Sequence, residues 1–76
     1  MIQIELKLFV TLARYLPSKS EVYDIEEGTT INQLITDLGI PNGIVKLIFI
    51  NGKKQDRNYL IQHKDRVGLF PPVGGG

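Results

Sequence analysis

The sequence predicts a two-layer α+β domain in which one main helix packs on a mixed sheet. Three observations predict it: an alternating apolar segment near each end of the chain, one amphipathic helix between them, and an Asn-Gly hairpin signal. With 76 residues the chain forms one domain, and folding buries only about 60% of the surface of so short a chain. It has no cysteine, so its stability must come from a compact apolar core.

The first strand is expected at residues 2–10, where apolar residues recur with the period of two that is typical of a strand buried on one side. Its inward face is expected to hold Ile2, Ile4, Leu6, Leu8 and Val10. A short helical turn should follow, capped by Thr11 and ended by Pro17. Residues 20–25 alternate again and should pair antiparallel with the first strand.

The helix expected at residues 30–38 is the best-specified element. Thr30 followed by Gln33 is a capping-box pattern. Gly39 stands where a left-handed C-terminal cap would be, and Pro41 lies just beyond. Between these signals the apolar residues fall at the helical spacing i, i+3, i+4 and i+7, as Ile31, Leu34, Ile35 and Leu38.

The remaining strands are expected at residues 46–50, 53–55 and 66–70, with a short strand or turn at 59–61. Asn51-Gly52 is a strong hairpin signal between the first two of these. Because the first and last strands are both strongly apolar on one face, we expect them side by side in the middle of the sheet. This is the β-grasp layout of ubiquitin. We place the β-grasp domain at residues 1–73 and a flexible glycine tail at 74–76.

The composition argues against several classes of function. The net charge is +1 with charges scattered along the chain, which is not the pattern of a protein that binds nucleic acid or an anionic membrane. No apolar run reaches about 18 residues, and the alternating N-terminus is unlike a signal peptide, so we expect a cytoplasmic protein. The single histidine, His63, is expected in a solvated loop, and Asp65 in a turn. We therefore expect no metal site and no catalytic residue in this chain.

The C-terminal sequence Pro-Pro-Val-Gly-Gly-Gly is the unusual feature. Pro71 and Pro72 should stiffen the chain where it leaves the last strand. Residues without side chains, Gly74, Gly75 and Gly76, can then thread a narrow tunnel and place a carboxylate in another protein's active site. Holding them there costs about 1–2 kcal/mol each in backbone entropy, so a docking surface elsewhere must offset that cost.

The strand pattern predicts such a docking surface. Phe9, Phe49 and Phe70, which are all the phenylalanines of the chain, fall on the positions that point away from the core. If their strands adjoin, they form one exposed apolar patch near the tail. Exposed apolar patches rimmed by polar residues usually mark an interface.

Three segments resemble the ubiquitin-like sulfur carriers: LFVTLARYLP, INGK and DRVGLFPPVGGG. The resemblance spans essentially the whole chain and is strongest to the small subunit of molybdopterin synthase, which typically closes with Phe-Pro-Pro-Val and Gly-Gly. Two departures are Gly74, where the molybdopterin carriers vary, and Lys64, where the family often has glycine. The first leaves open a carrier for another pathway, such as thiamine synthesis.

The resemblance implies a non-catalytic carrier with no bound cofactor. A ubiquitin-activating-type adenylyltransferase would use ATP to adenylate Gly76, and a sulfur donor would convert it to a thiocarboxylate. The large subunit of molybdopterin synthase would supply the catalytic groups for sulfur transfer. Gly74 and Gly75 would thread the partner's channel, while Phe9, Phe49, Phe70, Pro71 and Pro72 would dock.

Two other classes of function share parts of this pattern. A protein modifier would use the same tail to form isopeptide bonds with lysines of other proteins. A β-grasp RNA-binding module would not need the terminal glycines, and the nearly neutral charge argues against it. Deletion of Gly75 and Gly76 separates the carrier and modifier from the binding module.

Overall fold

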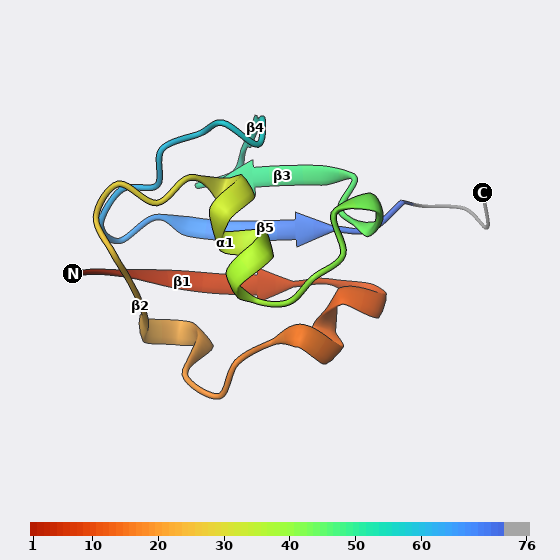
Figure 1. Ribbon diagram of the computed structural model, residues 1–76, viewed down its shortest axis with the longest axis horizontal. Helices are drawn as coiled ribbons and strands as arrows, with labels where there is room; N and C mark the ends of the chain where they lie inside the picture. Colours follow the sequence, from red (N-terminus) through yellow and green to blue (C-terminus); the bar gives the residue numbers. More distant parts are fainter. Residues whose placement is uncertain (73–76) are drawn as a thin grey trace.

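A five-stranded sheet and one α-helix form two layers in the computed structural model, which describes residues 1–72 (Figure 1). The sheet order is β2-β1-β5-β3-β4, in which β1 and β5 are parallel neighbours and the other pairs are antiparallel. The predicted central position of the first and last strands is therefore confirmed, and the fold is a ubiquitin-like β-grasp. The elements are β1 (Ile2–Leu8), β2 (Tyr23–Ile25), α1 (Ile31–Asp37), β3 (Leu47–Ile50), β4 (Lys53–Gln55) and β5 (Arg66–Phe70).

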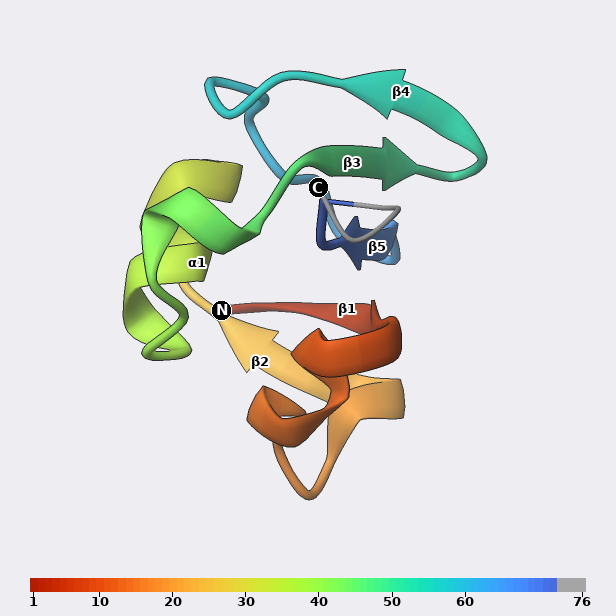
Figure 2. The same ribbon diagram turned by 90° about the vertical axis from the view of Figure 1, so that its right-hand side faces the viewer.

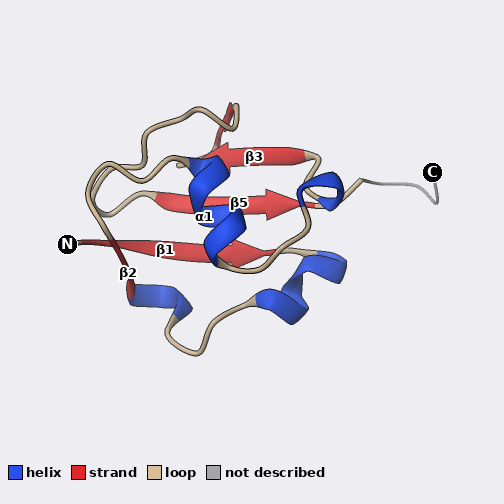
Figure 3. Ribbon diagram, viewed as in Figure 1, coloured by secondary structure: helices blue, strands red, loops and turns tan. Residues whose placement is uncertain are grey.

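Helix α1 covers one face of the sheet, and the apolar core lies between the two layers (Figure 2). Three short 3-10 helices, η1 (Val10–Tyr15), η2 (Ser20–Val22) and η3 (Asn42–Ile44), lie in the connections (Figure 3). Inward-facing residues of β1, β2, β3 and β5 form one apolar cluster with the buried residues of α1. The core side chains that are essentially inaccessible to solvent are Ile4, Leu12, Ile31, Leu34, Ile35, Ile61, Val67 and Leu69.

The predicted signals at both ends of α1 are confirmed. The hydroxyl of Thr30 accepts a hydrogen bond from the backbone N–H of Gln33 at 3.2 Å. Gly39 has φ +78°, a conformation that glycine adopts without strain. The reciprocal half of the capping box does not form, because the side chain of Gln33 donates to Asp37 instead.

The Asn51-Gly52 hairpin also forms as predicted. Asn51 has φ +53° and Gly52 has φ +85°, which are the two positive values that a type I′ turn requires. Ile50 and Lys53 face each other across this turn and start the pairing of β3 with β4.

The connection from β1 to β2 differs from the prediction in three respects. β1 ends at Leu8, and Val10 is 75% exposed rather than inward, because the chain turns at its positive φ of +56°. Thr11 lies inside η1 and does not cap it. Only Tyr23–Ile25 of the second predicted strand pairs with β1, and η2 flanks β1 beyond that pairing.

Asp65 anchors the stretch between β4 and β5. It was expected to be a turn carboxylate, but it is only 5% exposed. One carboxylate oxygen accepts from Asn51 Nδ2 at 2.9 Å; the other accepts from the Tyr59 hydroxyl at 2.9 Å and from the Gln62 backbone N–H at 2.8 Å. The side chain thus joins the hairpin turn, the loop at residues 59–62 and the start of β5.

This network makes stability depend on the protonation of Tyr59 at alkaline pH. Burial raises the pKa of the Tyr59 phenol above its usual value of about 10, and the hydrogen bond to Asp65 and the charge of that carboxylate raise it further. As the pH rises through about 10, the unfolded chain therefore loses this proton before the folded chain does, and the free energy of unfolding falls. In Tyr59→Phe this phenol is absent. We therefore expect its free energy of unfolding to fall less steeply with pH over the range between the pKa of Tyr59 in the unfolded chain and its higher pKa in the folded chain.

Urea unfolding at a series of pH values from about 8 to 11 measures this difference. Tyr23→Phe is the matched control, since within residues 1–72 the Tyr23 hydroxyl donates no hydrogen bond to a carboxylate. Parallel pH profiles for wild type and Tyr59→Phe would contradict the expectation.

Candidate docking surface

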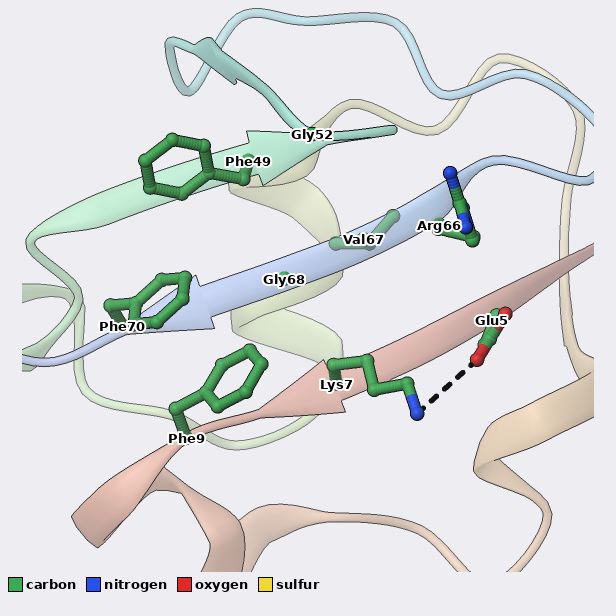
Figure 4. A pocket seen from close by; sticks show the side chains of 9 residues that line it. All are labelled: Glu5, Lys7, Phe9, Phe49, Gly52, Arg66, Val67, Gly68 and Phe70. Carbon is green, nitrogen blue, oxygen red and sulfur yellow. Dashed lines mark ion pairs between the residues drawn. The ribbon is translucent and has the colours of Figure 1, made fainter.

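The face of the sheet opposite α1 brings together the three phenylalanines that were predicted to point outward (Figure 4). The register explains the gathering. Phe49 of β3 lies opposite Gly68 of β5, and Leu47 lies opposite Phe70. Phe9 follows β1 directly and donates its backbone N–H to the Leu69 carbonyl at 3.1 Å, which holds it beside β5. We call Phe9, Phe49 and Phe70 the phenylalanine patch.

The rings of the patch are already packed against one another. Phe9 and Phe70 are stacked, with ring centroids 4.3 Å apart and an angle of 5° between the ring planes. Phe49 meets Phe70 edge to face, at 5.4 Å and 80°. Phe9 is 38% exposed, whereas the other two are half-buried by these contacts. Because each ring limits the movement of its neighbour, the packed rings hold the patch in one arrangement.

Charged side chains border the patch along the same face. Lys7 of β1 and Arg66 of β5 line the hollow that the rings enclose. Glu5 lines it too, and its carboxylate pairs with Lys7 at 3.4 Å. Lys54 faces Phe49 across the β3–β4 ladder and is exposed. The border therefore carries a net positive charge.

The chain leaves β5 directly beside the patch. Of the two prolines expected to contribute to docking, Pro72 is exposed but Pro71 is buried, so direct contact by this pair would fall to Pro72. Gly74, Gly75 and Gly76, the predicted threading and activation residues, lie outside the described residues, as does the predicted domain boundary at residue 73.

His63 is exposed as expected, but it has a defined contact: its Nδ1 accepts the backbone N–H of Gln3 at 3.1 Å. Within residues 1–72, no group of three or more His, Asp or Glu side chains is placed to hold a metal ion. Over the same range, no helix is long and apolar enough to cross a membrane.

Five residues of this surface were not singled out from the sequence: Glu5, Lys7, Lys54, Arg66 and Gly68. A glycine inside a predicted strand is a signal for close approach of another group, and it could have identified Gly68. The period-two alternation puts Lys7 on the outward face with Phe9, and Arg66 on the outward face with Phe70. That the two cations lie beside the same patch depends on the β1–β5 pairing, which the alternation does not reveal.

Comparison with known proteins gives the following matches. The model of the ThiS family matches residues 6–76. A comparison with curated proteins finds no match.

Three of the solved structures of similar fold come from Haloferax volcanii and Pyrococcus furiosus. Small archaeal modifier protein 1 of Haloferax volcanii is 21% identical, with a TM-score of 0.72 over 96% of this chain and 100% of its own. A Pyrococcus furiosus protein assigned as molybdopterin converting factor subunit 1 is 22% identical, with the same TM-score over 96% of this chain and 100% of its own. The Haloferax volcanii protein HVO 2177 is 25% identical, with a TM-score of 0.75 over 99% of this chain and 87% of its own.

Proposed function

Because the chain belongs to the ThiS family of ubiquitin-like sulfur carriers, we propose that it carries sulfur as a thiocarboxylate on Gly76 for the synthesis of molybdopterin. Proteins of this type act with an activating enzyme and a partner subunit, and they are generally not catalytic themselves. The observation that carries the proposal is the packed phenylalanine patch beside the end of β5. The resemblance of the Phe70-Pro71-Pro72-Val73 closing segment to the molybdopterin synthase small subunit supports the choice of pathway.

The proposed chemistry takes two steps, both catalysed by the partner. A carboxylate is a poor electrophile, so an oxygen of the Gly76 carboxylate first attacks the α-phosphorus of ATP and pyrophosphate leaves. A sulfur donor at the oxidation level of hydrosulfide then attacks the acyl carbon through its sulfur, the bond from that carbon to the AMP oxygen breaks, and the thiocarboxylate remains. Division into two steps replaces one difficult displacement by two easier ones.

The folded domain contributes binding rather than catalysis. The patch offsets the entropy lost when the glycines enter the partner's channel. In this proposal Phe9, Phe49 and Phe70 are the docking anchors, and exposed Pro72 adds contact close to the tail.

Mass spectrometry tests the proposal. Incubation with the ubiquitin-activating-type adenylyltransferase of the same organism, ATP and a sulfur donor should add about 16 Da, the difference between sulfur and oxygen, through a covalent intermediate. The added mass should map to the last peptide. Failure to gain it, under conditions in which a known carrier is converted, would contradict the carrier function.

The thiocarboxylated protein then distinguishes between pathways. A molybdopterin carrier should pass its sulfur to the pterin precursor in the presence of the large synthase subunit. A thiamine-pathway carrier would gain the 16 Da but fail this transfer. A protein modifier would use the same activated glycine, but it would be found joined by isopeptide bonds to lysines of other proteins.

Truncation of Phe70 should weaken docking more than it lowers stability. Phe70 contacts both other rings of the patch, and an interface anchor of this kind costs about 2 kcal/mol or more when truncated, roughly a thirtyfold loss of affinity. Calorimetric titration of Phe70→Ala with the large synthase subunit measures the loss. Leu60→Ala removes another exposed large apolar side chain, away from the patch, and should bind normally.

If Phe70→Ala binds as tightly as wild type while its unfolding midpoint falls sharply, then Phe70 serves stability and the patch is not the docking surface.

A further inference from the structure

The chain contains two Asn-Gly pairs, Asn42-Gly43 and Asn51-Gly52. Asparagine before glycine is chemically labile, because glycine has no Cβ to hinder attack of its backbone nitrogen on the side-chain amide. All four residues are exposed, and a Cβ built on either glycine would meet nothing within 4 Å. Neither the local sequence nor steric access therefore distinguishes the two sites.

Hydrogen bonds hold the side chain of Asn51 at both ends of its amide. Its Nδ2 donates to Asp65 Oδ1 at 2.9 Å, and its Oδ1 accepts the Arg66 backbone N–H, also at 2.9 Å. The Asn51 backbone N–H donates in turn to the Arg66 carbonyl at 2.9 Å. Any rotation of the amide toward the Gly52 nitrogen therefore breaks hydrogen bonds, one of them to a buried carboxylate.

The side chain of Asn42 has no such restraint. Within residues 1–72 its amide makes no hydrogen bond; its backbone carbonyl is what accepts from Arg57 Nη2 at 2.7 Å and from the Val45 backbone N–H at 3.5 Å. Asn42 begins η3, a single turn of three residues. The Asn42 amide is therefore free to rotate onto the Gly43 nitrogen.

We propose that Asn42 is a site of spontaneous deamidation in the folded protein, and that the fold protects Asn51 from the same reaction. The backbone nitrogen of Gly43 loses its proton and attacks Asn42 Cγ. The Cγ–Nδ2 bond breaks, ammonia leaves with that proton, and a cyclic imide remains. Water then opens the ring, at Cγ to give aspartate or at the backbone carbonyl to give isoaspartate. Either product adds one negative charge to a chain of net charge +1.

The two sites differ in what the new carboxylate would meet. At position 42 it joins a residue that already contacts the Arg57 guanidinium, whose buried Nη1 has no acceptor within the described residues. A negative charge beside that guanidinium is favourable. At position 51 the carboxylate would replace a donor and face the Asp65 oxygen that now accepts from Asn51 Nδ2 at 2.9 Å, which brings two like charges together. The fold thus protects the site at which modification would break the Asp65 network.

Peptide mapping of one sample tests both parts of the proposal. Trypsin places Asn42 in the peptide 20–46 and Asn51 in the peptide 47–53, and deamidation adds about 1 Da to either. After incubation of the folded protein at mildly alkaline pH, fragment ions should show Asn42 gaining this mass at least about tenfold faster than Asn51. In urea above the unfolding midpoint, where these hydrogen bonds are absent, the two rates should agree within about threefold.

Two variants separate the hydrogen bonds of Asn51 from overall stability. Asp65→Asn removes the carboxylate that Asn51 Nδ2 contacts, and it should raise the rate at Asn51 about fivefold or more while leaving the rate at Asn42 unchanged. Ile25→Val is the control, because it lowers stability through β2, at the opposite edge of the sheet from the β3–β4 hairpin. It should leave the ratio of the two rates as in wild type.

The Tm values of two further variants test the consequences. Asn51→Asp should lower Tm by roughly 8 °C or more, whereas Asn42→Asp should leave Tm unchanged or raise it. Equal rates at the two sites in the folded protein would overturn the protection of Asn51. An Asn42 that reacts in urea but not in the folded protein would overturn its assignment as the modification site. A wild-type Tm in Asn51→Asp would overturn the conflict with Asp65.

Discussion

We expect removal of Gly75 and Gly76 to abolish conversion of the chain to a thiocarboxylate. Two extended residues span about 7 Å, so the new terminal carboxylate would fall short of the partner's reactive site by roughly that distance. A misplacement of about 1 Å can already cost about a hundredfold in rate, so no adenylated product should be detectable over the assay. Exchange of labelled pyrophosphate into ATP measures the first step, and the 16 Da gain described above measures the second.

A variant with a tail of the original length tests whether the length of the tail or its lack of side chains is what the reaction requires. Replacement of Gly75-Gly76 by Ala-Ala keeps the reach but adds methyl groups in a channel proposed to fit side-chain-free residues. It should be slowed rather than inactive. An unchanged Tm for both variants would show that the folded domain is intact. Conversion of the truncated chain at the wild-type rate would leave the terminal glycines without the role proposed for them.

The largest effect on stability is expected at Asp65. Asp65→Ala leaves three hydrogen-bond donors without their acceptor: Asn51 Nδ2, the Tyr59 hydroxyl and the Gln62 backbone N–H. Hydrogen bonds to a charged group contribute about 1.5–3 kcal/mol each, so we expect a loss of about 3 kcal/mol or more. A domain of 76 residues has only about 4–11 kcal/mol in all, so the variant should be close to unfolding at 25 °C.

Asparagine should not rescue position 65. Asn51 already accepts the Arg66 backbone N–H with its Oδ1, so its amide nitrogen has to face residue 65. An asparagine at residue 65 would therefore point its own NH₂ at a donor in either orientation. We expect Asp65→Asn to lose roughly 2 kcal/mol or more, as expected for unpaired buried polar groups.

Urea unfolding at neutral pH measures both losses. Asp56→Ala is the control, since among residues 1–72 the exposed Asp56 carboxylate accepts only from the Asn58 backbone N–H, and the variant should lose no more than about 1 kcal/mol. A loss of less than about 1 kcal/mol in Asp65→Ala would show that the network does not hold the loop as proposed.

Local sequence patterns were sufficient to predict helix α1 and the β3–β4 hairpin. Thr30, the apolar stripe and Gly39 predicted α1 because each signal acts within one or two turns of the chain. Asn51-Gly52 predicted the β3–β4 hairpin because only a few residues accept two consecutive positive φ values. Val10, Thr11 and residues 20–22 were predicted wrongly because strand pairing, which involves distant residues, decides where a strand ends.

The sequence by itself determined the β-grasp fold, the outward register of the three phenylalanines and the expectation of a docking surface. Those features follow from the period-two and helical periodicities, which are properties of neighbouring residues. Only the tertiary structure decided that Phe9 and Phe70 stack, that Gly68 opens a hollow between them, and that Asp65 is a buried anchor. Phe9 and Phe70 are far apart in sequence, and only the parallel pairing of β1 with β5 brings them within contact distance.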